Sequence, residues 1–186
     1  MTTEVFFISD MHFFHKRILE FQAESGTRLG TTLDEMHHEL IQAWNRVVPA
    51  GGVVYNLGDV SFGRPGETVE ILRQLKGQHH LIIGNHDEAN LRDSSFRECF
   101  ASINHVKKIK VKEQKIWLSH FAHREWDGSH RGTWHLFGHS HGRTKPYGKS
   151  FDIGVDGGMC RNMEPVSFVR VYAYMQSLEM TTRDGN

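Results

Sequence analysis

The sequence predicts an α/β domain in which the first strands pair in parallel. Three apolar segments, at residues 5–9, 53–57 and 80–83, have the β-branched and aromatic composition of short buried strands. Between them lie two segments, residues 33–47 and 67–75, in which apolar residues recur at helical spacing. This alternation of strands and helices favours parallel pairing through right-handed crossovers.

The boundaries of these elements have local signals. A short helix is expected at residues 15–22, after the first strand. Thr32, with Glu35 three residues later, has the form of a capping box, so the long helix should begin there. Pro49 and the glycines after it end that helix, and Gly77 ends the next one.

The second half of the chain differs, because strands follow one another there with few helices between them. Residues 106–111 and 116–119 flank a polar turn and predict a hairpin. Three further short strands are expected at residues 134–137, 149–153 and 167–172. The two halves together favour a mixture of parallel and antiparallel pairing.

Length and charge restrict the function classes. With 186 residues, the chain fits one domain, expected over residues 1–186 with a frayed tail at about 180–186. Lys and Arg together number 22, as do Asp and Glu, so the net charge is zero with histidine neutral. Such a chain lacks the basic field of a protein that binds long duplex nucleic acid. No segment approaches the roughly 18 apolar residues of a membrane span, so no membrane partner is expected.

Histidine is the unusual component of the composition. The chain has 14 histidines and 2 cysteines, and histidine is the commonest metal ligand. Cys99 and Cys160 stand alone, which argues against a disulfide framework and against a cysteine-based zinc site. The N-terminal segment lacks the basic-then-apolar profile of a signal peptide. These features favour a metal site in a reduced, cytoplasmic protein.

Five polar clusters follow predicted strands or the turns after them: Asp10-Met11-His12, Gly58-Asp59, Gly84-Asn85-His86-Asp87, Ser119-His120 and Gly138-His139-Ser140-His141. In α/β sheets, sites assemble outside the carboxyl ends of the strands. Residues two apart on a strand point to the same side, so Asp10 and His12 can bind one cation together. The same holds for His139 and His141, unless the turn directs them to two ions. The glycines allow the backbone to turn sharply and to approach a ligand closely.

Together and in this order, the five clusters resemble the motifs of the calcineurin-like metallophosphoesterases. The resemblance extends to Trp44-Asn45 and to the segment at residues 151–156, so it covers most of the chain. It is strongest to the compact, cap-less members common in bacteria and their phages. It implies a four-layer αββα sandwich, in which two mixed β-sheets are flanked by helices, and a binuclear metal centre.

The resemblance also implies which residues hold the two divalent metal ions. One ion would be held by Asp10, His12, Asp59 and His141. The other would be held by Asp59, Asn85, His120 and His139, with Asp59 as the bridge. Nitrogen and oxygen ligands without thiolate suit Mn²⁺, Fe or Zn²⁺, and the habit of the family favours Mn²⁺.

His86 is carried over from the family as the catalytic acid rather than as a ligand. A hydroxide bridging the two metals would attack phosphorus. His86 would protonate the leaving oxygen, because imidazole titrates near neutral pH. Asp87 is grouped with His86 as a catalytic residue, either orienting it or supporting the site from behind.

Substrate contacts are expected at the rim of the site. The candidates are His15, Arg64, His123, Arg124 and Arg131. The loop at residues 121–133 is either a substrate-binding loop or an ordinary polar surface loop. Asp152 and Asp156 fit turns, or hydrogen bonds to a ligand histidine, better than direct ligation. The Asp-Arg pair that phosphoprotein phosphatases carry after the Gly-Asp motif is absent after Asp59, which argues against a protein phosphatase.

The expected function is metal-dependent hydrolysis of a phosphodiester. The absence of a cap insertion and the neutral charge favour a small nucleotide, or a short single-stranded nucleic-acid end, as the substrate. A phosphomonoesterase that acts on nucleotides is the alternative with similar chemistry. A non-catalytic metal-binding scaffold is the alternative from a different class, and the presence of His86 argues against it.

Overall fold

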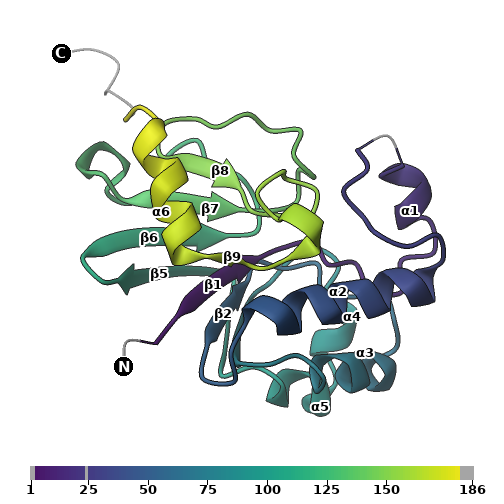
Figure 1. The fold of residues 1–186 in the computed structure, drawn as a ribbon. Helices are drawn as coiled ribbons and strands as arrows, with labels where there is room; N and C mark the ends of the chain where they lie inside the picture. Colours follow the sequence, from purple (N-terminus) through teal and green to yellow (C-terminus); the bar gives the residue numbers. More distant parts are fainter. Residues whose placement is uncertain (1–2, 24, 181–186) are drawn as a thin grey trace.

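Two mixed β-sheets make up the centre of the protein, and helices flank them (Figure 1). The computed structural model describes residues 3–23 and 25–180. The arrangement is the expected α/β sandwich, so the predicted fold class is confirmed. Within the described residues, no helix is both long enough and apolar enough to cross a membrane.

The first sheet has the strand order β4-β3-β2-β1-β9. Strands β1 (Val5–Ile8), β2 (Val53–Asn56), β3 (Gln78–Ile82) and β4 (Ser102–Asn104) run parallel to one another. The short strand β9 (Val166–Ser167) pairs with β1 in the antiparallel direction. The parallel pairing predicted for the first three strands is therefore confirmed.

The second sheet has the order β5-β6-β7-β8. Strands β5 (Val106–Val111) and β6 (Gln114–Ser119) form the expected antiparallel hairpin. Its tight turn includes Lys112, whose φ of 52° is left-handed. Strands β7 (Trp134–Phe137) and β8 (Ser150–Asp152) continue the sheet in parallel with β6.

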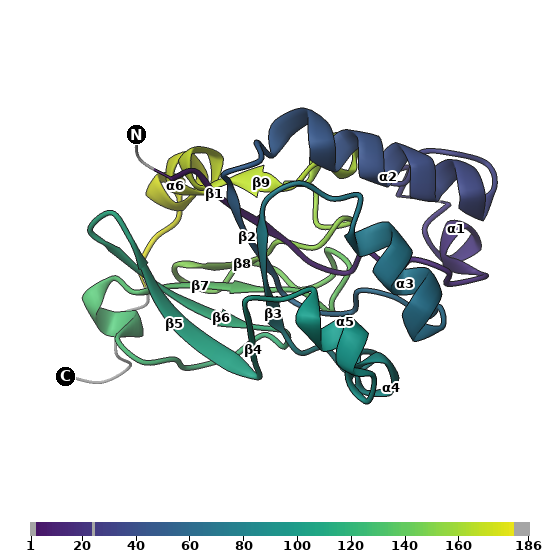
Figure 2. The same cartoon turned by 90° about the horizontal axis from the view of Figure 1, so that it is seen from below.

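Most helices belong to the first half of the chain. They are α1 (Ile18–Phe21), α2 (Leu33–Val47), α3 (Pro65–Leu72), α4 (Glu88–Leu91) and α5 (Ser94–Glu98). Figure 2 shows α2, α3 and α5 beside the first sheet. The helices α4 and α5 were not expected, because each is too short to show an apolar period.

Helix α2 begins and docks through specific side chains. The Thr32 hydroxyl accepts a hydrogen bond from the backbone N–H of Glu35 at 3.2 Å, which confirms the predicted cap. The Glu35 carboxylate accepts a hydrogen bond from the backbone N–H of Thr31, whereas in a capping box it would accept from the N–H of Thr32. Farther along, the Trp44 indole N–H donates to the Lys76 carbonyl at 2.9 Å, which fixes α2 against the turn before β3.

The strand predicted at residues 167–172 is wrong. Only Val166–Ser167 is extended, and the chain then forms α6 (Phe168–Ser177). The β-branched and aromatic residues suggested a strand, but Ser167 caps a helix, since its hydroxyl accepts the backbone N–H of Arg170 at 3.4 Å. The residues that α6 buries recur at helical spacing: Phe168, Val171 and Met175.

Helix α6 lies where the two sheets meet. It continues from β9 of the first sheet, and its Phe168 ring is 6.0 Å from the Trp134 ring of β7. Two 3-10 helices, η1 (Ser129–Arg131) and η2 (Arg161–Met163), lie in the connections of the second half. The tail predicted from residue 180 falls outside the described residues, apart from Met180.

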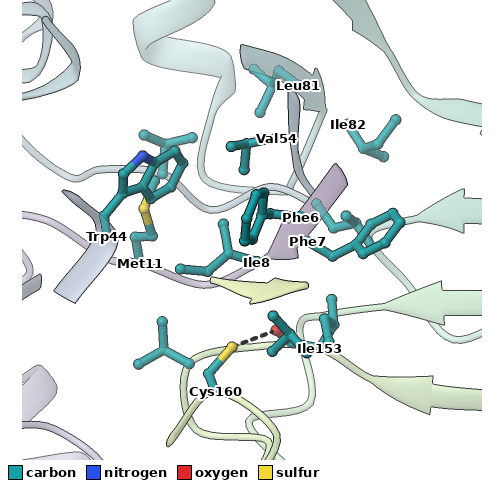
Figure 3. Packing of buried hydrophobic residues seen from close by; sticks show 14 of the residues in the cluster. Phe6, Phe7, Ile8, Met11, Trp44, Val54, Leu81, Ile82, Ile153 and Cys160 are labelled. Carbon is teal, nitrogen blue, oxygen red and sulfur yellow. Dashed lines mark hydrogen bonds between the residues drawn. The ribbon is translucent and has the colours of Figure 1, made fainter. Parts of the chain in front are cut away.

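A single cluster of buried hydrophobic residues joins the two sheets and α2. Figure 3 shows its centre, where Ile8 of β1 points toward Trp44 of α2, the neighbouring Phe7 points to the other side of the strand, and Ile153 belongs to the same cluster. These four side chains are at most 1% exposed. Burial of each such side chain stabilises the fold by about 1.5–3 kcal/mol. The core therefore holds both sheets rigidly beneath the loops that follow their strands.

The carboxyl ends of the parallel strands from both sheets meet at one edge of the sandwich. There the Val155 N–H donates to the Ser9 carbonyl at 3.0 Å, and Ser9 forms an isolated parallel bridge with Gly154. This link ties the end of β1 to the segment after β8. It brings the polar clusters of the two sheets to the same place.

Candidate metal centre

Two groups of ligand-type side chains lie at this edge. Asp10, His12 and His141 form one, the first ligand group, and each offers an atom within 4.8 Å of the others. The second ligand group has the same spacing and consists of Asp59, His120 and His139. The structure thus brings together side chains that follow β1, β2, β6 and β7, and divides them into the two sets expected from the sequence.

Asp59 lies between the two groups. Its Oδ2 atom is 3.5 Å from His120 Nε2 in its own group. The same oxygen is 3.7 Å from His12 Nε2 in the first group. A carboxylate in this position faces both groups at once, which is the placement that a bridging ligand requires.

The backbone of both groups is held in an unusual conformation. The φ angles are left-handed at five of the six residues: 57° at Asp10, 53° at His12, 55° at Asp59, 65° at His139 and 49° at His141. Such angles cost of order 1–3 kcal/mol each for non-glycine residues and concentrate at functional sites. Here they let the chain leave each strand abruptly, so that consecutive ligands turn inward.

Glycines permit the close approach of the loops. A Cβ atom at Gly84 would lie 2.2 Å from Asp59 Oδ1, and one at Gly138 would lie 2.0 Å from Ser9 Oγ. Both distances are far below contact, so any side chain at these positions would push a carboxylate or its neighbour out of place. The glycines of Gly84-Asn85 and Gly138-His139 therefore have a steric reason.

His12 is buried without hydrogen-bonding partners. It is 3% exposed, and both of its ring nitrogens lack a partner among the described residues. Burial lowers the pKa of His12, which favours the neutral ring that binds metals. An unsatisfied buried nitrogen costs about 1–3 kcal/mol, so a cation at this position fits the site.

The Nε2 atom of His120 faces two oxygen atoms that are also hydrogen-bond acceptors. Its Nδ1–H donates to the Leu57 carbonyl at 2.7 Å, which leaves Nε2 free. That atom is 3.0 Å from Asn85 Oδ1 and 3.5 Å from Asp59 Oδ2. Three acceptors that converge in this way attract positive charge.

The pKa values of Asp59 and His120 reflect this attraction for positive charge. Burial raises the pKa of Asp59, but its interaction with His120 outweighs burial and brings the pKa to about 2. Burial lowers the pKa of His120, yet Asp59 and Asp10 raise that pKa to about 9. The second ligand group therefore holds a proton strongly, as it would hold a cation.

The first ligand group has a buried ion pair behind it. His141 Nδ1–H donates to Asp156 Oδ2 at 2.7 Å, which directs Nε2 toward the group. Arg28 pairs with the same carboxylate oxygen at 2.8 Å, and its side chain is 1% exposed. The guanidinium also donates to the carbonyls of Asp10 at 2.7 Å and Met11 at 2.8 Å.

Charge and burial reinforce this arrangement. The contacts with His141 and Arg28 outweigh burial and hold the pKa of Asp156 well below its usual range. The pKa of His141 is raised, because Asp156 outweighs the effect of burial. The hydrogen bond expected between Asp156 and a ligand histidine is present. The role of Arg28 was not predicted from the sequence, because its partner Asp156 is 128 residues away and no local sequence pattern indicates the pairing.

Two further carboxylates, those of Asp87 and Asp152, hold the loops around the site mainly by accepting hydrogen bonds from backbone N–H groups. Asp87 is fully buried and accepts the backbone N–H groups of Asp59 at 3.0 Å, Val60 at 2.9 Å and Gly84 at 2.8 Å. Within the described residues, no hydrogen bond joins it to His86. Asp87 therefore supports the loops after β2 and β3 from behind, and the geometry does not place it among the reacting groups.

Asp152 has the corresponding role after β7 and β8. Its carboxylate accepts from the Ser140 hydroxyl at 2.6 Å and from the backbone N–H groups of Gly142 at 2.9 Å and Gly154 at 2.7 Å. Burial raises the pKa of this carboxyl. These bonds shape the turn that carries His139 and His141, as the turn-making interpretation expected.

His86 lies at the mouth of the site. Its backbone N–H donates to Asp59 Oδ1 at 2.9 Å, and its Nε2 is 3.9 Å from Asp59 Oδ2. The side chain is 44% exposed, so it faces solvent beside both ligand groups. This position allows the imidazole to reach a molecule bound over the carboxylates.

Of the five expected substrate-contact residues, His15 is the one for which the described residues show a neighbour in a ligand group. The His15 ring is 5.6 Å from the His12 ring, at the rim. In the part of the chain that is described, no ion pair or hydrogen bond links the remaining candidates to either group. These are Arg64, His123, Arg124 and Arg131.

The loop at residues 121–133 is partly packed onto β7. Trp126 is 6% exposed, and its indole N–H donates to the Thr133 carbonyl at 2.8 Å. Its ring also lies 5.1 Å from the ring of His135. The first residue of the loop behaves differently, because Phe121 is 48% exposed beside His139. Phe121 and the similarly exposed Phe62 were not singled out from the sequence, since an apolar residue in a loop carries no motif.

Comparison with known proteins places the fold. No family model matches the chain. The chain is 30% identical over 173 residues to the uncharacterized protein MJ1445 of Methanocaldococcus jannaschii, covering 88% of this chain and 86% of that one. A protein of unknown function from Aquifex aeolicus, AQ665, shares the fold with a TM-score of 0.71 and 21% identity, over 93% of this chain and 100% of that chain. A novel archaeal phosphodiesterase has a TM-score of 0.50 and 15% identity, over 82% of each chain.

Proposed function

We propose that the chain is a calcineurin-like metallophosphoesterase, a two-metal phosphoesterase that hydrolyses phosphodiesters. One observation carries the proposal. Asp59 lies between two ligand groups whose free atoms are acceptors, at 3.5 Å from His120 and 3.7 Å from His12. Two such groups around one carboxylate suit a pair of cations better than a core packing role.

The residues present fit a divalent metal pair. Asp10, His12, His141 and Asp59 would hold one ion. Asp59, Asn85, His120 and His139 would hold the other. Bound there, the ions would activate water as the nucleophile and neutralise charge on the phosphoryl group. The donor set contains nitrogen and oxygen but no thiolate, which suits Mn²⁺, Fe or Zn²⁺, and we propose Mn²⁺ first.

His86 is proposed as the general acid. A leaving alkoxide needs a proton, imidazole is a common general acid, and the His86 ring is exposed beside Asp59. The hydrogen bond from its backbone to Asp59 keeps the ring beside the place where phosphate would bind. Asp87, which the sequence grouped with it, would contribute by holding the Asp59 loop in place.

The substrate is proposed to be a small nucleotide or a short single-stranded nucleic-acid end, hydrolysed in the cytoplasm. The second ligand group is open, since Asn85 and His139 are exposed. An open group admits the two substituents of a diester, where a closed pocket would favour a terminal phosphate. The cysteines Cys99 and Cys160 are both unpaired, which suits a reducing compartment.

A panel of substrates with Mn²⁺ tests the proposal. It should compare aryl phosphate monoesters and diesters, 2′,3′- and 3′,5′-cyclic nucleotides, and single-stranded oligonucleotides, with Asp59→Asn as the inactive control. We expect diesters to be hydrolysed faster than monoesters. The opposite order would identify a phosphomonoesterase. A protein that binds two ions and hydrolyses none of these would be a scaffold.

His86→Ala separates the acid role from metal binding. We expect kcat to fall by roughly 10²–10⁴-fold while both metals are retained. His38→Ala, on the exposed face of α2, is the matched control. If hydrolysis by His86→Ala were unchanged, another group would supply the proton. Metal content measured beside kcat shows whether any loss comes instead from a collapsed site.

A further inference from the structure

Two exposed phenyl rings border the ligand groups, one on each. Phe62 is 41% exposed, and its ring centre is 5.3 Å from that of His12 and 4.5 Å from that of His86. Phe121 is 48% exposed, and its ring centre is 4.6 Å from that of His139. Single exposed apolar residues are common, but these two lie against different ligand groups, Phe62 against His12 and Phe121 against His139.

The backbone that carries each ring is fixed. The Phe62 N–H donates to the Phe13 carbonyl at 2.8 Å, so the segment after Asp59 runs along the segment after β1. The Phe121 carbonyl accepts from the hydroxyl of the buried Ser119 at 2.8 Å. Both rings are therefore carried on backbone that is fixed before any ligand arrives, which reduces the backbone entropy lost on binding.

Positive charge follows Phe121 along the chain. Residues 121–149 contain five Arg and Lys against two Asp and Glu, although the whole chain is neutral. Arg124, Arg143 and Lys145 are exposed, and the Arg124 guanidinium lies 6.0 Å from the ring centre of Tyr147. Exposed cations interleaved with aromatic rings are typical of surfaces that bind single-stranded nucleic acid.

We propose that Phe62 and Phe121 stack on the two bases that flank the scissile phosphodiester of a single-stranded nucleic acid. Phe62 takes the base on the leaving-group side, because it lies against His86. Phe121 takes the base that stays on the phosphate, and the chain continues toward Arg124 and Arg143. The inference rests on the proposed phosphodiesterase function and makes the two rings its specificity determinants.

Two p-nitrophenyl esters test Phe121 with the leaving group held constant. The p-nitrophenyl ester of thymidine 5′-phosphate carries a base on the retained side, and methyl p-nitrophenyl phosphate carries none. We expect Phe121→Ala to lower kcat/KM for the thymidine ester about 5- to 150-fold more than for the methyl ester. Tyr172→Ala is the control, since Tyr172 is an exposed aromatic residue (47%) on α6.

Binding provides a second measurement that does not depend on turnover. Competition titrations should compare hexathymidylate with an abasic hexamer that has the same phosphates. Wild type should prefer hexathymidylate, and Phe62→Ala and Phe121→Ala should each reduce that preference.

The outcomes separate this inference from the proposed function. If wild type hydrolyses both esters but neither variant changes the preference for bases, the stacking role is refuted and the phosphodiesterase stands. If wild type hydrolyses neither ester, the phosphodiesterase is refuted. The hexamer comparison then still decides the roles of the two rings.

Discussion

The two ligand groups have similar chemistry but different surroundings. In the first group, Asp10 is fully buried and His12 is 3% exposed. In the second group, His139 is exposed, and so is Asn85 beside it. Asp59 and His120 of the second group are as buried as Asp10 and His12, so the groups differ in their third member. His141 is partly buried, whereas His139 faces solvent beside the exposed ring of Phe121.

The support behind each group differs in the same direction. His141 of the first group is fixed by Asp156, which is in turn paired with buried Arg28. On its Nδ1 side, His120 of the second group is fixed by a backbone carbonyl, that of Leu57, rather than by a charged side chain. Buried partners behind a ligand orient it and raise metal affinity. We therefore expect the first group to bind its ion more tightly, and the second to exchange its ion and admit substrate.

The largest effect is expected where the groups are joined. Asp59→Asn removes the charge that both groups share, so we expect the protein to lose both ions, not one. Metal content per chain after gel filtration measures this directly. Asp127→Asn, which alters an exposed carboxylate paired with Lys108, should leave metal content unchanged. Retention of a single ion by Asp59→Asn would show that the groups are independent and would refute the bridge.

A smaller effect should separate the two groups. Asp156→Asn keeps the shape of the side chain but leaves the buried Arg28 charge without its partner. We expect metal affinity to fall about 10- to 100-fold at the first group only. We also expect the metal-free protein to lose about 3–5 kcal/mol of stability. Metal titration and urea unfolding measure the two effects.

A surface ion pair provides the matched comparison for Asp156→Asn. Glu164→Gln disrupts the Arg46–Glu164 pair, in which the Arg46 side chain is 55% exposed, and should cost at most about 1 kcal/mol. Arg28→Met should weaken the first group in the same direction as Asp156→Asn. Equal weakening of both groups by Asp156→Asn would remove the distinction between an enclosed and an open half.

The residues of the two groups could be selected from the sequence because each follows a strand. Asp10 and Asp59 end neighbouring parallel strands, and such ends meet at one edge whatever the lengths of the connections. The pairing of Arg28 with Asp156 could not be selected in this way. The Arg28–Asp156 pair joins two loops whose residues are 128 positions apart. Near Arg28, the sequence shows just an arginine in a polar segment, which does not indicate a buried partner.

The error at α6 has a similar origin. The segment from Phe168 to Tyr172 is rich in β-branched and aromatic residues, which favours a strand when read alone. The structure exposes Val169 to 69% and buries Val171 completely, in keeping with one helical face packed against β7. Tertiary packing therefore overrode local preference, as short apolar segments permit.

The smallest effect concerns the pH dependence of the metal-free protein. The folded pKa of His120 is about 9, because the carboxylates around it outweigh burial. Asp156 likewise outweighs burial and raises the pKa of His141. Such a histidine stabilises the fold fully below its unfolded pKa of about 6.5, and that stability is lost as the pH rises through the folded pKa. We expect the melting temperature to fall by a few degrees, roughly, between about pH 6.5 and 9.

Metal should reverse the sign of this slope, because ligand histidines must be neutral to bind it. Melting curves at both pH values, with and without Mn²⁺, measure the two slopes. His12 and His139 act in the opposite direction, because burial lowers their pKa values; the stability they contribute rises as the unfolded histidines lose their protons near the lower end of this interval. In Asp156→Asn, His141 loses the carboxylate charge that raises its pKa, so the slope that persists belongs to His120. A metal-free melting temperature that rises between about pH 6.5 and 9 would contradict the pairing of His120 with Asp59. It would also contradict the positive charge that this pairing gives His120 in the second ligand group.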